Sequence, residues 1–117
     1  MTIDRNELQQ TDFDDLLSAD AERDEPIAPG EILHEDFLEP LGLSAAALAR
    51  ALHVPANRIT AVINGQRSVS ADTALRLARY FGTTPEFWMR LQAEYELRKA
   101  RRQVADTIRR EVSPRVA

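Results

Sequence analysis

Apolar residues recur at three- and four-residue steps from residue 30 onward, the spacing expected for one face of an α-helix. Five such stretches follow one another: Ile32, Leu33, Phe37, Leu38 and Leu41; Leu48, Ala49 and Leu52; Ile59, Val62 and Ile63; Ala74, Leu75, Leu77, Ala78 and Phe81; Phe87, Trp88, Leu91 and Tyr95. The helical composition then continues weakly through Val104 and Ile108. Strand-like alternation of Val, Ile and Thr is lacking, so the pattern predicts an all-α protein of five helices with a long fifth helix.

Residues that begin or end helices stand between these stretches. The candidate N-caps are Ser44, either Ser70 or Asp72, and Thr84, which is followed by Pro85 at the first helical turn. The candidate stops are Gly42, Asn64-Gly65 and Gly82.

The second and third helices are short and are separated only by the break at His53-Val54-Pro55. Helices of about eight residues stabilise themselves poorly, so their apolar faces must fix them against each other. This arrangement is typical of a helix-turn-helix, whose second helix enters the major groove of DNA. One departure is His53, because a glycine is usual where the turn favours a positive φ; histidine tolerates that region better than most residues.

The solvent face predicted for the third helix carries short side chains that suit base edges in DNA. Asparagine can hold adenine through two hydrogen bonds, and threonine or alanine can touch a thymine methyl. This face holds Ala56, Asn57, Thr60, Ala61 and Asn64, with Arg58 beside them. Ser44, at a helix N-terminus, and Arg67, just beyond the third helix, suit phosphate. The alternative is that such residues simply make an ordinary polar helix surface.

Charge is distributed unevenly along the chain of 117 residues, whose net charge is −4. Residues 1–25 hold nine acidic residues against two arginines, whereas residues 26–117 hold thirteen basic residues against ten acidic ones. The sequence therefore divides into an acidic tail expected to be flexible (1–28), a helix-turn-helix domain (29–98) and a C-terminal helical extension (99–117). Acidity in a separate tail weakens the usual electrostatic objection to DNA binding, and charge alone does not decide the question.

Several functional classes lack their required residues. The chain has no cysteine, which excludes thiolate zinc sites and cysteine nucleophiles. His34-Glu35-Asp36 has no second histidine four residues away, so it predicts solvated positions and not a metal site. With neither a phosphate loop nor a Ser/His/Asp grouping, we expect no enzyme, cofactor or metal. We also expect no membrane span or secretory signal, and hence a cytoplasmic protein.

Three segments together resemble one family: PGEIL with FLEPLGLS, ITAVINGQRSVSADTALRLARYFGT, and TPEFWMRLQAEYEL. Residues 29–97 look like the HigA-type antitoxins, within the Cro/repressor, XRE-like class of helix-turn-helix proteins with a lambda-repressor-like fold. The resemblance implies a homodimer that represses its own operon by binding an inverted repeat in double-stranded DNA and neutralises a HigB/RelE-like ribonuclease toxin. It also implies DNA contacts from the third helix, at Ala56, Asn57, Arg58, Thr60 and Asn64. Relatives often have glutamine where this chain has Ala45, which leaves a contact at that position unsupported.

Two further segments have open interpretations. The stripe of Phe87, Trp88, Leu91 and Tyr95 either closes the domain core or pairs with its two-fold mate in a dimer. Residues 1–25 either form a solubilising arm or bind a basic toxin surface through Phe13, Leu16 and Leu17. For the whole chain, the alternatives to an antitoxin are a stand-alone repressor without a toxin and a protein-interaction domain that has lost DNA binding.

Overall fold

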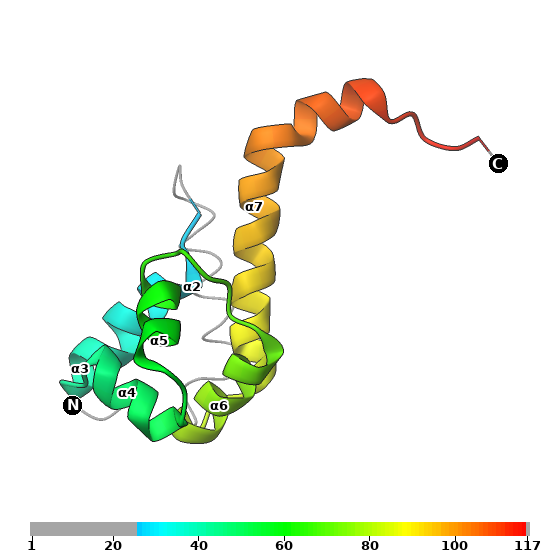
Figure 1. Ribbon diagram of the computed structural model, residues 1–117. Helices are drawn as coiled ribbons and strands as arrows, with labels where there is room; N and C mark the ends of the chain where they lie inside the picture. Colours follow the sequence, from blue (N-terminus) through cyan, green and yellow to red (C-terminus); the bar gives the residue numbers. More distant parts are fainter. Residues whose placement is uncertain (1–25, 117) are drawn as a thin grey trace.

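The computed structural model describes residues 26–116, which form helices and no strands (Figure 1). The first helical stretch runs unbroken through α2 (Pro29–Ile32), the π-helical segment η2 (Leu33–Leu38) and α3 (Glu39–Leu41). The others are α4 (Ala45–Leu52), α5 (Ala56–Ile63), α6 (Ala71–Phe81) and α7 (Pro85–Glu111). The prediction of an all-α protein with five helices, the last one long, is confirmed for this part of the chain.

Local hydrogen bonding sets the helix ends where the sequence predicts them. The hydroxyl of Ser44 accepts a hydrogen bond from the Ala47 N–H at 3.0 Å, and that of Thr84 accepts one from the Phe87 N–H at 3.1 Å. The cap of α6 is Ser70 and not Asp72, because the Ser70 hydroxyl accepts from the Thr73 N–H at 3.3 Å. The left-handed residues that end α3 and α6 are Gly42 and Gly82, with φ of 61° and 75°.

The first helix contains a widened turn that the apolar spacing does not reveal. In η2 the Glu39 N–H donates to the carbonyl of His34, five residues earlier, instead of four. Pro40 follows directly; its ring has no N–H and would crowd the carbonyl four residues before it in a regular α-helix. The wider turn relieves this crowding and keeps Phe37 and Leu38 on the buried side.

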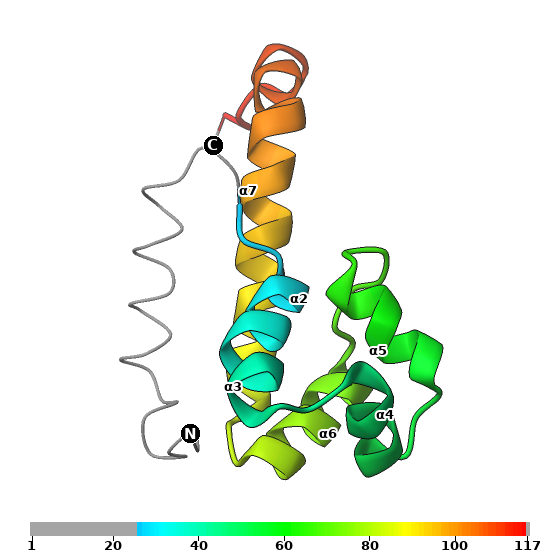
Figure 2. The same cartoon turned by 90° about the vertical axis from the view of Figure 1, so that its left-hand side faces the viewer.

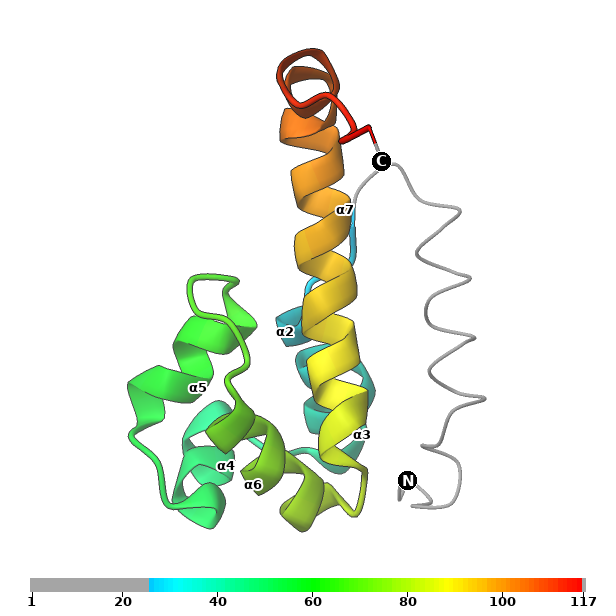
Figure 3. The same cartoon turned by 90° about the vertical axis from the view of Figure 1, so that its right-hand side faces the viewer.

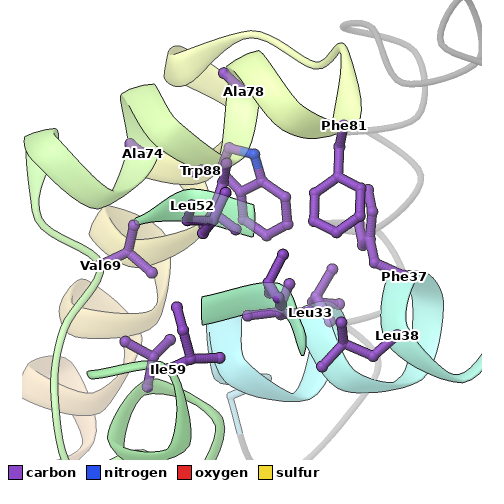
Figure 4. Packing of buried hydrophobic residues seen from close by; sticks show 14 of the residues in the cluster. Leu33, Phe37, Leu38, Leu52, Ile59, Val69, Ala74, Ala78, Phe81 and Trp88 are labelled. Atoms are coloured by element: carbon purple, nitrogen blue, oxygen red, sulfur yellow. The ribbon is translucent and has the colours of Figure 1, made fainter. Parts of the chain in front are cut away.

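An aromatic cluster forms the centre of the core (Figure 4). The Phe37 ring centroid lies 4.9 Å from those of both Phe81 and Trp88, in tilted arrangements that aromatic rings favour. The Trp88 side chain is fully buried, and its Nε1–H donates to the Thr83 hydroxyl at 2.8 Å. This bond satisfies the one polar group that the indole brings into the core.

The stripe at the start of α7 mostly belongs to this core. Phe87, Trp88 and Leu91 are only 3%, 0% and 6% exposed within a single chain. This burial favours the core interpretation for these three, since their surfaces already contact their own chain, and their assignment to a dimer interface stays a prediction. Tyr95 is half-buried, and its place in a dimer stays a prediction.

The long helix α7 packs along α6 and α2 and then projects beyond the other helices (Figure 1). It passes without interruption through residue 98, where the sequence predicted the end of the domain. Beyond that point Val104 and Ile108 are exposed. The division between domain and extension therefore stays a prediction, and the two parts share one helix.

Candidate nucleic-acid interface

The two short helices α4 and α5 meet through a tight turn. His53 ends α4 with φ 58° and ψ 47°, the left-handed conformation that the sequence required of this position. The Val54 N–H donates to the Ala49 carbonyl at 3.0 Å, which closes the turn, and Pro55 then precedes the first residue of α5. The predicted helix-turn-helix geometry is confirmed, with a histidine where glycine is usual.

One face of α5 is buried and the other is exposed, as the sequence predicts. Ile59 and Val62 are 0% and 2% exposed and hold the helix against the core. The exposed face carries Ala56, Asn57, Thr60 and Asn64. Figures 2 and 3 show α5 along an outer side of the bundle, in agreement with the exposure of these four residues. The structure therefore brings together four of the five residues predicted to read DNA from this helix.

Arg58 does not join that row. Its side chain is 25% exposed, and its Nη1 lies 3.2 Å from Oδ1 of Asp72 on α6, which makes an ion pair. At 100° per residue Arg58 lies about 160° around the helix from Thr60, on the inward side. The helical spacing carried this signal, because Arg58 falls beside Ile59 and Val62 and away from Thr60.

The two predicted phosphate-binding residues are both exposed, Ser44 directly before α4 and Arg67 in the loop after α5. Ser44 begins α4, where its hydroxyl accepts the capping hydrogen bond and keeps its own O–H for a further acceptor. Arg67 is exposed in the loop after α5, and its backbone N–H donates to the Ala61 carbonyl at 3.2 Å. Backbone bonding thus holds the loop against the end of the helix, next to Asn64.

Two contacts that position α5 and its loop were not anticipated from the sequence. Gly30 of α2 lies so close to α5 that an added Cβ would meet the Val62 carbonyl oxygen at 2.1 Å. Gln92 of α7 is buried, and its Oε1 accepts a hydrogen bond from the Val69 N–H at 2.8 Å. In the sequence, Gly30 marked only a helix start and Gln92 was an ordinary polar residue of a long helix.

A cluster of charged residues connects α6 with both short helices. Arg76 Nε donates to Asp72 Oδ1 at 2.8 Å, and Arg76 Nη1 donates to the Leu52 carbonyl at the end of α4, also at 2.8 Å. The hydrogen bond from Arg76 holds the pKa of Asp72 below its ordinary value, against the opposing effect of desolvation. Asp72 is therefore a carboxylate at neutral pH.

Phe13, Leu16 and Leu17, predicted to bind a toxin, lie outside the described residues. Within residues 26–116, no group of three or more His, Asp and Glu side chains could hold a metal ion. None of the helices in the same range is both long and apolar enough to cross a membrane.

Comparison with known proteins places this interface in a family. A helix-turn-helix family model matches residues 35–88, a range that contains α4, the turn and α5. Virulence-associated protein I of Dichelobacter nodosus is 54% identical over 74 residues, which are 63% of this chain and 68% of that protein.

Two solved structures share both the fold and much of the sequence. An addiction module antidote protein of the HigA family from Coxiella burnetii aligns with a TM-score of 0.74 at 50% identity, covering 78% of this chain and 99% of that one. The antitoxin HigA of Pseudomonas aeruginosa, solved with the higBA promoter, gives a TM-score of 0.76 at 47% identity, covering 79% and 100%. The chain belongs to the HigA family of helix-turn-helix antitoxins. The resemblance predicted from the three HigA-like segments is thereby confirmed.

Proposed function

We propose that this HigA-family protein is an antitoxin that represses its own operon by binding operator DNA through α5. The observation that carries the proposal is the uninterrupted exposed row of short polar and small residues on α5, opposite a fully buried Ile59. A related HigA from Pseudomonas aeruginosa was solved with promoter DNA, which supports the same ligand for this chain.

The proposed readout divides between bases and backbone. The side-chain amides of Asn57 and Asn64 suit adenine. The edge of this base donates one hydrogen bond to the amide oxygen and accepts one from the amide nitrogen. Thr60 and Ala56 present methyl groups to thymine; the Thr60 hydroxyl already donates to the Ala56 carbonyl at 3.2 Å, which turns its polar atom toward the helix. Ser44 and Arg67 bind phosphate and set the register of the helix on the duplex.

The protein is proposed to bind as a homodimer, because two recognition helices about one DNA turn (~34 Å) apart read an inverted repeat. Tyr95 is the one residue of the predicted dimer stripe that the core leaves available. The same proposal includes a cytoplasmic location, no catalytic activity and no cofactor.

Measuring affinity for an operator duplex and a random duplex over a range of salt concentrations tests the DNA contacts. Asn57→Ala should lose about 1–3 kcal/mol on the operator and little on random DNA, since a base contact carries sequence preference. Arg67→Ala should weaken binding to both duplexes and lower the salt slope by about one unit. Arg79→Ala on α6 removes the same charge outside the proposed interface and serves as the matched control. Equal losses on both duplexes for Asn57→Ala would contradict its assignment.

The toxin partner is proposed to be a HigB/RelE-like ribonuclease, and contact through Phe13, Leu16 and Leu17 stays a prediction. Native mass measurement on the protein co-expressed with the small open reading frame beside its gene tests this part. A stable heterocomplex, with growth arrest when the neighbour is expressed alone, would support the antitoxin role. A homodimer with a harmless neighbour would instead identify a stand-alone repressor.

A further inference from the structure

Three helices of the DNA-binding unit meet at a single charged network. Asp72 stands in the first turn of α6, and its Oδ1 accepts from Arg76 Nε one turn later at 2.8 Å and from Arg58 Nη1 of α5 at 3.2 Å. Arg76 Nη1 then donates to the Leu52 carbonyl at 2.8 Å. One carboxylate and one guanidinium on α6 therefore contact both α4 and α5.

The two α6 residues of the network, Asp72 and Arg76, also stabilise helix ends. The last carbonyls of an α-helix have no partner within the helix, so Arg76 supplies one for the end of α4 and complements its negative end. Asp72 lies at the positive end of α6, where a carboxylate is favoured. The pairing of Asp72 with Arg58 is thus fixed from the α6 side, because Arg76 and the helix end both hold the carboxylate in place.

The Arg58 guanidinium is bound within this network through its ion pair with Asp72. Its Nε is buried and has no hydrogen-bond partner among the described residues, which shows that the group is turned into the protein. To reach DNA, the side chain would have to leave Asp72 and swing around α5 toward the exposed row. The other four candidates on α5 already face solvent without any such change.

We propose that Asp72 and Arg76 are positioning residues for operator recognition, and that they act through Arg58. In this proposal Arg58 fixes the angle of α5 against α4 and does not contact DNA. The inference rests on the proposed operator binding and deepens it. In it, the sequence preference of the exposed row depends also on the contacts among Asp72, Arg76 and Arg58, which are called the brace from here on.

A double-mutant cycle on the full-length protein tests the brace. The variants are Arg58→Gln, Asp72→Asn and the two combined, each measured on an operator duplex and a random duplex over a range of salt. The combined variant has the net charge of the wild type, so a loss of affinity in it cannot arise from net charge.

We expect each single variant to bind the operator about five-fold more weakly than the wild type, which is the upper range for an exposed ion pair. The combined variant should lose no more operator affinity than either single variant does. Affinity of the combined variant for random DNA should stay within about two-fold and its salt slope should match the wild type, since no phosphate contact is removed. Arg76→Gln should give the same loss of operator preference.

The opposite results would show a direct DNA contact. If Arg58 bound phosphate, Asp72→Asn would free it and leave operator affinity equal or higher. Arg58→Gln would then lower the salt slope by about one unit in both backgrounds. Either result overturns the proposal.

A second ion pair offers a matched control far from α5. Arg109 and Asp106 pair near the end of α7, both more exposed than Arg58, so Arg109→Gln with Asp106→Asn makes the same charge-neutral change. This variant should keep wild-type affinity on both duplexes. Thermal denaturation of every variant identifies any that fail to fold. Absence of operator binding by the wild type would refute the proposed function, whereas normal preference in the folded combined variant would refute only the brace.

Discussion

Replacing Gly30 by alanine should displace α5 from its buried side, where α2 packs directly against it. An added Cβ would lie 2.1 Å from the Val62 carbonyl oxygen and 2.8 Å from both Cα and the carbonyl oxygen of Ile63. Ordinary van der Waals contact begins near 3.4 Å, so α2 and α5 must separate by about 1.3 Å at this point. Because all three neighbouring atoms belong to the backbone, no side-chain rotation can relieve the clash.

The size of the effect follows from two opposing contributions. Overpacking of this kind costs about 1–3 kcal/mol, and rigid backbone neighbours favour the upper part of that range. Alanine in place of glycine gains up to about 1 kcal/mol in helix propensity. The expected net loss is about 1–2 kcal/mol in the free energy of unfolding, which lowers Tm by roughly 4–16 °C in a domain of this size.

Thermal and urea denaturation measure the loss, and the neighbouring Glu31→Ala provides the control, since Glu31 lies exposed on the same helix. Operator affinity of Gly30→Ala, measured well below its Tm, should also fall, because α5 moves with the Val62 and Ile63 backbone. If Gly30→Ala were as stable as Glu31→Ala, the close approach of α2 and α5 would not constrain the fold as argued.

Three further predictions follow from single contacts. His53→Gly should raise the free energy of unfolding by up to about 1 kcal/mol, because glycine adopts the left-handed conformation without the cost that a side chain adds; a lower Tm would contradict this. Gln92→Ala should lower the urea midpoint by the equivalent of about 1–3 kcal/mol, because it leaves a buried backbone N–H without a partner. Gln103→Ala, at an exposed position of the same helix, should change the urea midpoint little. An equal loss in both variants would refute the role assigned to the hydrogen bond from Val69 to Gln92. Asp72→Asn should lower Tm at pH 7, and the difference should vanish as the pH falls well below 3.8. The reason is that the hydrogen bond from Arg76 lowers the pKa of Asp72, so the stabilisation is present above the ordinary pKa and is lost once the folded-state carboxylate protonates. A difference that persisted in acid would show that charge is not the cause.

Features that depend on a few neighbouring residues could be predicted from the sequence. The caps at Ser44 and Thr84 and the stop at Gly82 depend only on the local chain, and each appears where expected. The same holds for the inward face of α5, since Ile59 and Val62 share the helical period with the core.

Features that depend on contacts between distant segments could not be predicted in this way. The close approach of Gly30 to α5 and the bond from Gln92 to Val69 join residues far apart in the chain. Periodicity also predicts an apolar stripe on a helix but does not indicate which surface packs against it. For this reason the sequence around Trp88 was compatible with a dimer interface as well as with a core. Arg58 differs, because its angular position on α5 already indicated an inward side chain.

The buried indole described above gives the protein an internal reporter. Trp88 is the only tryptophan in the chain, and it lies in the aromatic cluster, bonded to Thr83, while the exposed row of α5 faces away from the core. Its fluorescence should therefore emit at short wavelength in the folded state and shift to the red only when the core opens to water. Unfolding can thus be followed without a label, and duplex DNA added at α5 should leave the emission maximum in place.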